Sequence, residues 1–159
     1  MRRSAPLRDQ VTAGLVAGFT AGILIQAFYF VAWIARGEPA ARFADTFVFI
    51  AATVLGPSAQ TNAAAVPIGI VLHFCVAIGW ALGYVYLIRA QPQLLARPWI
   101  SGAAFGLVVY VFMQIILLYA GQYHRPAPQL LGTELIAHIV FYGVPVALIA
   151  SRTLRRATG

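Results

Sequence analysis

Charge is the scarcest property of this sequence. Only 9% of the residues are charged and 61% are hydrophobic, against about 25% and about 45–50% in ordinary soluble domains. Four acidic and eleven basic side chains are too few to form the charged shell that a soluble domain of 159 residues needs. Most of the surface is therefore expected to face hydrocarbon, which predicts an integral membrane protein.

Lysine is absent, so the net charge of +7 comes from arginine alone. The arginines stand at the ends of apolar segments, a pattern typical of topology signals and lipid-headgroup contacts, and we exclude nucleic acid as a partner. Cysteine occurs once, at Cys75, which excludes an internal disulfide and a metal site built from several cysteines.

Long uncharged segments predict four transmembrane helices. About 20 apolar residues cross the hydrocarbon core of a bilayer, and three uncharged segments exceed that length: 11–35, 66–88 and 99–120. A fourth span is expected at 128–151. Its uncharged stretch, 135–150, has only 16 residues, but the helix can extend outward through Glu134 to Pro128, which suits the first turn of a helix. We interpret 11–35 as a retained helix, since a signal peptide has an apolar core of only roughly 7–15 residues. Residues 1–159 are expected to form one membrane domain.

A fifth apolar segment, residues 43–55, is predicted to be helical without crossing the membrane. Phe43, Phe47, Ile50 and Val54 recur at helical spacing, but a helix of this length covers only about 20 Å. We therefore expect an interfacial or re-entrant helix between the first two spans. The predicted fold class is all-α, a polytopic four-transmembrane-helix bundle with this one short additional helix.

The distribution of arginine predicts that the N and C termini are both cytoplasmic. With four spans, the side opposite the termini holds Arg36, Arg42 and Arg125. The side of the termini holds eight arginines: Arg2, Arg3, Arg8, Arg89, Arg97, Arg152, Arg155 and Arg156. Cytoplasmic loops carry an excess of positive charge. A crossing at 43–55 would put the termini on opposite sides and abolish the asymmetry.

Glycines spaced four residues apart predict close packing between helices. They are Gly14, Gly18 and Gly22 in the first span, Gly79 and Gly83 in the second, and Gly102 and Gly106 in the third. The fourth span carries Gly143 and Ala147 at the same spacing. All of these lie in the predicted cytoplasmic half, so the bundle is expected to be tightest there. Pro145 is expected to bend the fourth helix, because it cannot donate to the carbonyl of Phe141.

Polar side chains inside the predicted spans form a candidate site. Each span carries one, namely Gln26, His73, Gln114 and His138, and Glu134 lies one turn outside His138 on the same face. A rise of 1.5 Å per residue places each of the four about 9–13 Å beneath the outer end of its helix. The sequence therefore predicts one inward-facing polar layer in the outer leaflet.

Several roles remain open for this layer. It can be a hydrogen-bond network that fixes helix register, or it can hold a quinone, lipid or other amphiphile. His73 and His138 can ligate haem axially, or bind copper or zinc with Glu134 as a third ligand. They can also form a proton or small-solute path. The sequence has no phosphate-binding loop, zinc-protease motif or serine triad, so no catalytic residue is predicted and an enzyme is not favoured.

Three helical stretches carry a family pattern. They are Leu72-His73-Phe74-Cys75 with the following Gly79, Gly83 and Tyr84, then Gly102 to Tyr110, and Glu134 to His138. Together with Leu55-Gly56 they resemble small bacterial inner-membrane proteins of unknown function, the YagU type and its relatives. The resemblance implies a four-helix inner-membrane protein with histidines in the second and fourth helices and no established activity. A histidine is expected near Gln114, where this sequence departs from the pattern.

The function expected from these features is that of a small inner-membrane protein whose outer polar cluster locks the bundle or holds a small ligand. One alternative is a haem- or metal-binding electron-transfer protein that uses His73 and His138. Another is an accessory subunit of a larger membrane complex. The expected partners are the lipid bilayer and, in addition, other membrane subunits or further copies of the chain.

Overall fold

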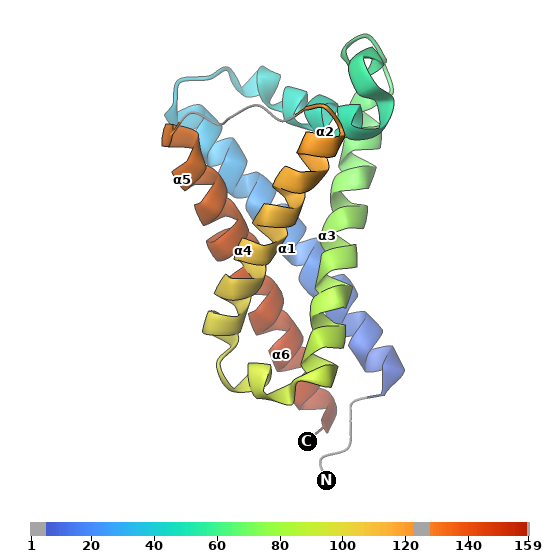
Figure 1. Ribbon diagram of the computed structural model, residues 1–159, viewed down its shortest axis with the longest axis vertical. Helices are drawn as coiled ribbons and strands as arrows, with labels where there is room; N and C mark the ends of the chain where they lie inside the picture. The colour runs from blue at the N-terminus through green and yellow to red at the C-terminus, as the bar shows by residue number, and fades with distance from the viewer. Residues whose placement is uncertain (1–5, 123–127, 159) are drawn as a thin grey trace.

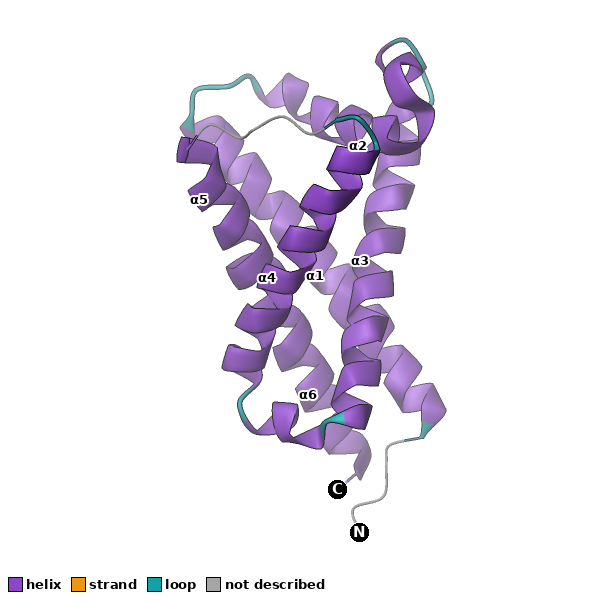
Figure 2. Cartoon of the chain, viewed as in Figure 1, coloured by secondary structure: helices purple, strands orange, loops and turns teal. Residues whose placement is uncertain are grey.

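The computed structural model describes residues 6–122 and 128–158, and these ranges contain helices and no strand (Figures 1 and 2). The all-α fold class expected from the sequence is confirmed. In chain order the elements are α1 (Leu7–Ala35), η1 (Ala40–Ala44), α2 (Asp45–Leu55), η2 (Gly56–Gln60), α3 (Ala65–Ala90), η3 (Pro92–Ala96), α4 (Pro98–Tyr119), α5 (Pro128–Ile136), the π-helical η4 (Ala137–Gly143) and α6 (Val144–Thr158).

The number of segments that could span a membrane differs from the four expected. By length and composition, five segments of the described chain qualify: Leu7–Ala35, Ala40–Gln60, Ala65–Ala90, Pro98–Tyr119 and Leu131–Arg156. The additional segment is a composite, because the 3₁₀ turns η1 and η2 flank the 11 residues of α2. Gly56 ends α2 with a φ of 63°, a left-handed conformation that glycine adopts without strain.

The direction of α2 sets it apart from the long helices. In Figure 1, η1 and α2 run across the upper end of the bundle, between the end of α1 and the beginning of α3. We call this end the α2 end. The beginning of α1, η3 and the end of α6 lie at the opposite end, which we call the terminal end (Figure 1). Arg2, Arg3 and Arg125, which contribute to the charge asymmetry, lie outside the described residues.

Small side chains dominate the core where the long helices pack. α1 packs on α3 and α6, and α4 packs on η4 and α6. Fully buried alanines mark these contacts: Ala13, Ala17, Ala21, Ala81, Ala147 and Ala150. Aromatic rings bridge α3 and α4, with Trp80 and Phe112 at 5.3 Å between ring centroids and Tyr84 and Phe105 at 4.8 Å. Alanine cores let helix backbones approach, which is how helices associate in lipid.

The glycines of α1 lie directly against α3. A Cβ added at Gly18 would lie 2.6 Å from the Ile78 Cα, and one at Gly22 would lie 3.2 Å from the Phe74 ring. Gly14 meets α3 one turn nearer the terminal end. No side chain larger than hydrogen fits at Gly18 unless the two backbones separate.

The glycines of α4 lie against η4 and α6 in the same way. A Cβ at Gly102 would lie 2.8 Å from the Ala147 Cβ, and one at Gly106 would lie 2.8 Å from the Ile139 Cα. Gly143 faces this contact from the other side, where it meets the backbone of Gly102 and Gly106. The two glycine contacts hold α1 to α3 and α4 to the last helix.

Gly79 and Gly83 do not pack as the sequence analysis expected. Both are exposed on α3, and a Cβ added at either position meets no atom within 4 Å. The buried positions on this part of α3 are Ala77, Ala81 and Tyr84, which lie on the opposite face of the helix. Gly69, which was not among the predicted packing residues, instead lies directly against the Phe47 backbone of α2.

The last long helix changes its winding where a bend was expected. Residues Ala137–Gly143 form a π-helix, immediately before Pro145 in α6. Proline has no N–H to donate to the preceding turn, and a wider turn is one way in which a helix adjusts to that loss. The π segment includes His138, so this local change also sets the direction of a candidate site residue.

Candidate functional site

Gln26 and His73 form a hydrogen-bonded pair between α1 and α3. The His73 Nε2 lies 3.0 Å from the Gly22 carbonyl oxygen, and the His73 Nδ1 lies 3.2 Å from the Gln26 Nε2. Because a carbonyl oxygen only accepts, Nε2 must donate the proton, and Nδ1 then accepts from the Gln26 amide. This arrangement fits a neutral histidine with both ring nitrogens satisfied.

Gln114 and Glu134 form a second pair, between α4 and α5. The Gln114 Nε2 donates to the Glu134 Oε2 at 2.9 Å. One turn along, the His138 Nδ1 donates to the Glu134 backbone carbonyl at 2.9 Å, which leaves Nε2 as the acceptor of a neutral ring. The pair therefore joins two helices through an uncharged donor and a carboxyl group.

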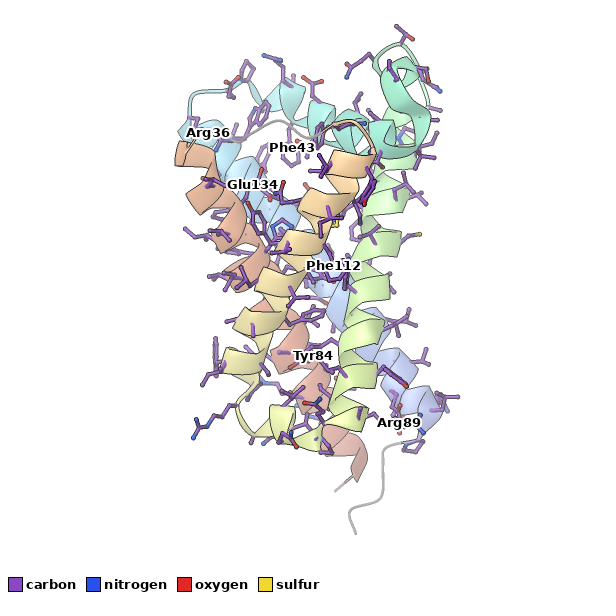
Figure 3. All side chains as sticks on the ribbon, viewed as in Figure 1. Arg36, Phe43, Tyr84, Arg89, Phe112 and Glu134 are labelled. Atoms are coloured by element: carbon purple, nitrogen blue, oxygen red, sulfur yellow. The ribbon has the colours of Figure 1, made fainter. Side chains whose placement is uncertain are left out.

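Aromatic rings contact His138 and its neighbours in η4. The Tyr110 and His138 ring centroids are 5.5 Å apart, and Phe28 stacks on Phe141 at 4.3 Å. Figure 3 shows Glu134 in the upper part of the bundle, near the α2 end. These ring contacts join α1, α4 and η4.

The polar residues predicted to form a single layer form two separate hydrogen-bonded pairs in the structure. Gln26 is hydrogen-bonded to His73, and Gln114 to Glu134, whereas His138 bonds to its own helix. The Gln26 Oε1 is buried without a hydrogen-bond partner among the described residues. The two pairs are neighbours with different chemistry.

The described part of the chain gives little support for a metal site. No group of three or more histidine, cysteine, aspartate or glutamate side chains is arranged there to hold a metal ion. Cys75 is exposed on α3. Because both His73 nitrogens have protein partners, that ring would have to give up at least one bond to bind a haem iron, copper or zinc.

Other buried polar contacts lie closer to the terminal end and were not predicted. The Tyr142 hydroxyl donates to the Ala77 carbonyl, which ties η4 to α3. The Tyr84 hydroxyl and the Ser101 Oγ are 2.7 Å apart. Hydropathy does not distinguish a tyrosine in an apolar segment from its hydrophobic neighbours, so the sequence did not indicate these hydrogen bonds.

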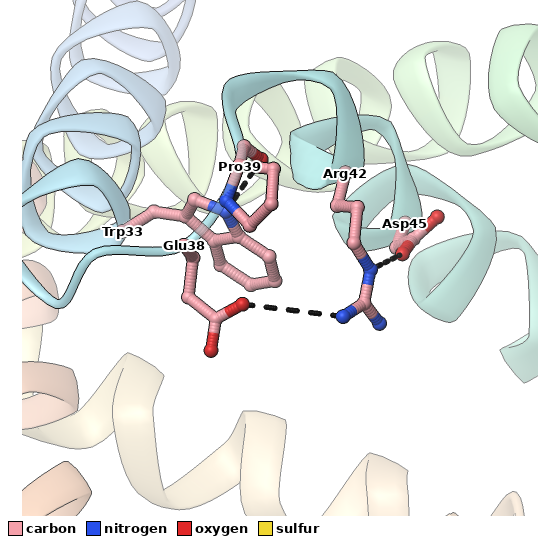
Figure 4. A network of polar contacts seen from close by, with 5 residues as sticks. All are labelled: Trp33, Glu38, Pro39, Arg42 and Asp45. Atoms are coloured by element: carbon pink, nitrogen blue, oxygen red, sulfur yellow. Dashed lines mark hydrogen bonds and ion pairs between the residues drawn. The ribbon is translucent and has the colours of Figure 1, made fainter.

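A surface network covers the connection from α1 to α2 (Figure 4). Arg42 lies between two carboxylates, with 3.3 Å to the Asp45 Oδ2 and 3.9 Å to the Glu38 Oε2. The Trp33 indole N–H donates to the Pro39 carbonyl at 3.1 Å. Exposed charges beside an amphipathic aromatic ring are typical of the boundary between lipid and water.

Comparison with models of known protein families, with curated proteins and with solved structures gives no match to this chain. The resemblance to the YagU type therefore stays a prediction.

Proposed function

We propose that this chain is a small four-span protein of a bacterial inner membrane, with its N and C termini in the cytoplasm. The observation that supports this best is the transverse course of α2, which joins the ends of α1 and α3 on one side of the bundle. If α2 lies on the outer surface, the other four apolar segments return the chain to the side where it began. A helix of 11 residues covers only about 16 Å and suits this position.

The described charges support the proposed orientation. The terminal end carries the larger group of arginines: Arg8, Arg89, Arg97, Arg152, Arg155 and Arg156. The α2 end carries Arg36 and Arg42, and Arg42 forms ion pairs with Glu38 and Asp45. The end of the bundle with the larger number of arginines is expected to lie on the cytoplasmic side.

Fusions after Gly159 test the proposed orientation. Green fluorescent protein becomes fluorescent in the cytoplasm, whereas alkaline phosphatase becomes active only in the periplasm. We expect a fluorescent first fusion and an inactive second one. The opposite pair of results would refute the proposal.

The two polar pairs are proposed to have different roles. Gln26 donates to His73, whose two ring nitrogens both bond to α1, and these bonds lock α1 to α3. The carboxyl group of Glu134 is held by a neutral amide, and an ionisable residue inside a membrane protein is costly and usually marks a functional site. We therefore assign the ligand-holding role to the second pair and the structural role to the first.

A haem- or metal-binding electron carrier is the competing function. It requires free lone pairs on His73 and His138, and the bonds of His73 to Gln26 and Gly22 weigh against it. An absorbance spectrum and metal analysis of the purified protein separate the two proposals. A Soret band that disappears in His73→Ala would favour the electron carrier, whereas a colourless, metal-free protein would contradict it.

An accessory subunit or homo-oligomer is a second candidate, favoured by the exposed glycines of α3. Gly79 and Gly83 leave one face of α3 open to a close helix partner, and such spacing is common where membrane helices associate. Native mass spectrometry in detergent tests this candidate. A dimer or a stoichiometric complex would support it, and a monomer from gently solubilised membranes would contradict it.

A further inference from the structure

We infer that the terminal end of the bundle is a binding surface for anionic phospholipid headgroups, formed by Arg8, Arg89, Arg97 and Arg152. We call these four residues the terminal arginines. They stand in α1, in α3, directly before α4 and in α6, so each long helix contributes one. All four are exposed. The inference goes beyond the proposed function, because it names a partner for the end opposite the candidate site.

The positive charge of the protein is concentrated at the terminal end. All four acidic side chains of the sequence belong to described residues, and of these only Asp9 lies at the terminal end. The other three lie toward the α2 end, at Glu38, Asp45 and Glu134. Asp9 can balance at most one arginine, so the terminal end keeps a strongly positive surface, which attracts anionic lipids.

The terminal arginines lie at similar distances from the apolar segments of their helices. Each stands within three residues of an uncharged segment, which is no more than about 5 Å along a helix. These segments belong to helices that are long and apolar enough to cross a bilayer. Figure 1 shows that the helix ends concerned lie at the same end of the bundle. Long arginine side chains at such positions reach the phosphate layer of the membrane.

Two exposed aromatic side chains accompany these arginines. Tyr86 is 71% exposed and precedes Arg89 by about one helical turn, and both residues line one surface hollow. Figure 3 shows Arg89 near the lower end of α3. Trp99 is 62% exposed and follows closely after Arg97. Tyrosine and tryptophan are enriched at the level of the headgroups, so their positions agree with the depth assigned to the arginines.

The chemistry of arginine suits an anionic phospholipid. A guanidinium group offers donors in a planar fork that matches two phosphate oxygens, which a lysine ammonium does not, and the sequence contains no lysine. A zwitterionic headgroup presents the same phosphate without a net charge. Arg155 is engaged differently, because it donates to the Leu95 carbonyl and ties α6 to η3. The terminal arginines are therefore expected to prefer phosphatidylglycerol to phosphatidylcholine.

Quenching of tryptophan fluorescence by brominated lipid tests this preference on the full-length protein. Trp33→Phe keeps Trp99 at the terminal end, Trp99→Phe keeps Trp33 at the α2 end, and both variants retain Trp80. Each is placed in vesicles of equal parts phosphatidylcholine and phosphatidylglycerol, with bromine on one lipid or the other. We expect brominated phosphatidylglycerol to be the stronger quencher of Trp33→Phe, and the two lipids to quench Trp99→Phe alike. No preference in Trp33→Phe, or the same preference in both variants, would overturn the inference.

Arginine substitutions in the Trp33→Phe background test the assignment to residues. Arg89→Gln and Arg97→Gln together should lower the relative affinity for phosphatidylglycerol by about fivefold or more, since each arginine near an anionic surface contributes to binding. Arg42→Gln is the matched control, because it removes an arginine of the α2 end that forms ion pairs with two carboxylates, and it should change nothing. If the control lowers the affinity as much as the double variant, the assignment is wrong.

Two further measurements need no arginine variant, so they stay decisive if the double variant does not fold. Raised potassium chloride should weaken the preference of Trp33→Phe for phosphatidylglycerol by screening the charges, and a preference that salt leaves unchanged would contradict the inference. Inorganic phosphate, compared with potassium chloride at the same ionic strength, should have no additional effect. If phosphate alone abolishes the preference, the arginines bind the free ion and the assignment to a lipid is wrong.

Failure of this inference can be distinguished from failure of the proposed function. The vesicles carry both lipids in both leaflets, so the quenching result does not depend on which side the terminal end faces. Fusions that report the opposite orientation would refute the proposed topology alone, whereas equal quenching by the two lipids would refute the lipid surface alone.

Discussion

At the scale of single residues, His73 shows how a polar side chain is accommodated in an apolar bundle. Its two ring nitrogens bond to a side chain and a carbonyl of the same neighbouring helix, α1. A neutral ring with both nitrogens satisfied avoids the cost of an unpaired polar group in lipid. Its pairing therefore favours a structural role.

A double-mutant cycle measures the contribution of this pair. Gln26→Leu and His73→Leu, alone and together, should give a coupling free energy of about 0.6 kcal/mol, the usual size for a hydrogen bond between membrane helices. Unfolding by denaturing detergent, followed by circular dichroism, provides the measurement. Gln26 and Gln114, which lack a common bond, should give no coupling. A zero value for Gln26 with His73 would contradict the proposed lock.

Tyr142 provides a second test at this scale. Tyr142→Phe removes the hydroxyl that donates to the Ala77 carbonyl and should lower the free energy of unfolding by about 1 kcal/mol. Tyr119→Phe removes the same atom from a side chain that is 87% exposed and should change little. Equal effects in the same unfolding assay would show that the buried bond contributes nothing specific.

At the scale of helices, two glycines of identical chemistry have opposite environments. A Cβ added at Gly18 would lie 2.6 Å from the Ile78 Cα, whereas a Cβ added at Gly83 would meet no atom within 4 Å. We expect Gly18→Leu to destabilise the fold by about 1–3 kcal/mol or more through overpacking. Gly83→Leu should leave the monomer stable. Thermal unfolding in detergent distinguishes them, and a larger loss in Gly83→Leu would contradict the helix faces described.

The positions of the helices follow well from the sequence, whereas their contacts do not. Residues 66–88 and 99–120 were expected to be helical, and the structure has Ala65–Ala90 and Pro98–Tyr119. Uncharged length determines where a helix crosses lipid, so hydropathy is informative about its ends. The four-residue spacing of Gly79 and Gly83 indicates a small-residue face, but it does not say whether that face meets this chain or something else.

The sequence predicted the depth of the candidate site residues in the membrane, but not which of them bond to one another. The helical rise placed Gln26, His73, Gln114 and His138 near one level. Pairing depends on how each helix is rotated about its axis, and an apolar residue on every side leaves that rotation undetermined by hydropathy. The π turn at Ala137–Gly143 shifts the rotation further. The bonds of His138 to its own helix and of Gln114 to Glu134 therefore became clear only in the structure.

At the scale of the whole molecule, the two ends of the bundle differ. Gly14, Gly18 and Gly102 hold the long helices together nearer the terminal end, whereas the polar pairs and the transverse α2 lie toward the other end. This asymmetry is what the proposed function needs, because it places a rigid helix contact on one side of the membrane and a polar site beneath the other surface.

The number of crossings is the most direct test of the account as a whole. In a Cys75→Ala background, Glu38→Cys and Ala63→Cys place single thiols at exposed positions before and after Ala40–Gln60. Gln93→Cys, in exposed η3 at the terminal end, is the control. We predict that a membrane-impermeant maleimide labels the first two from outside intact cells, and the third only after permeabilisation. Labelling of only one of the first two from outside would show that Ala40–Gln60 crosses the membrane and would contradict the four-span account.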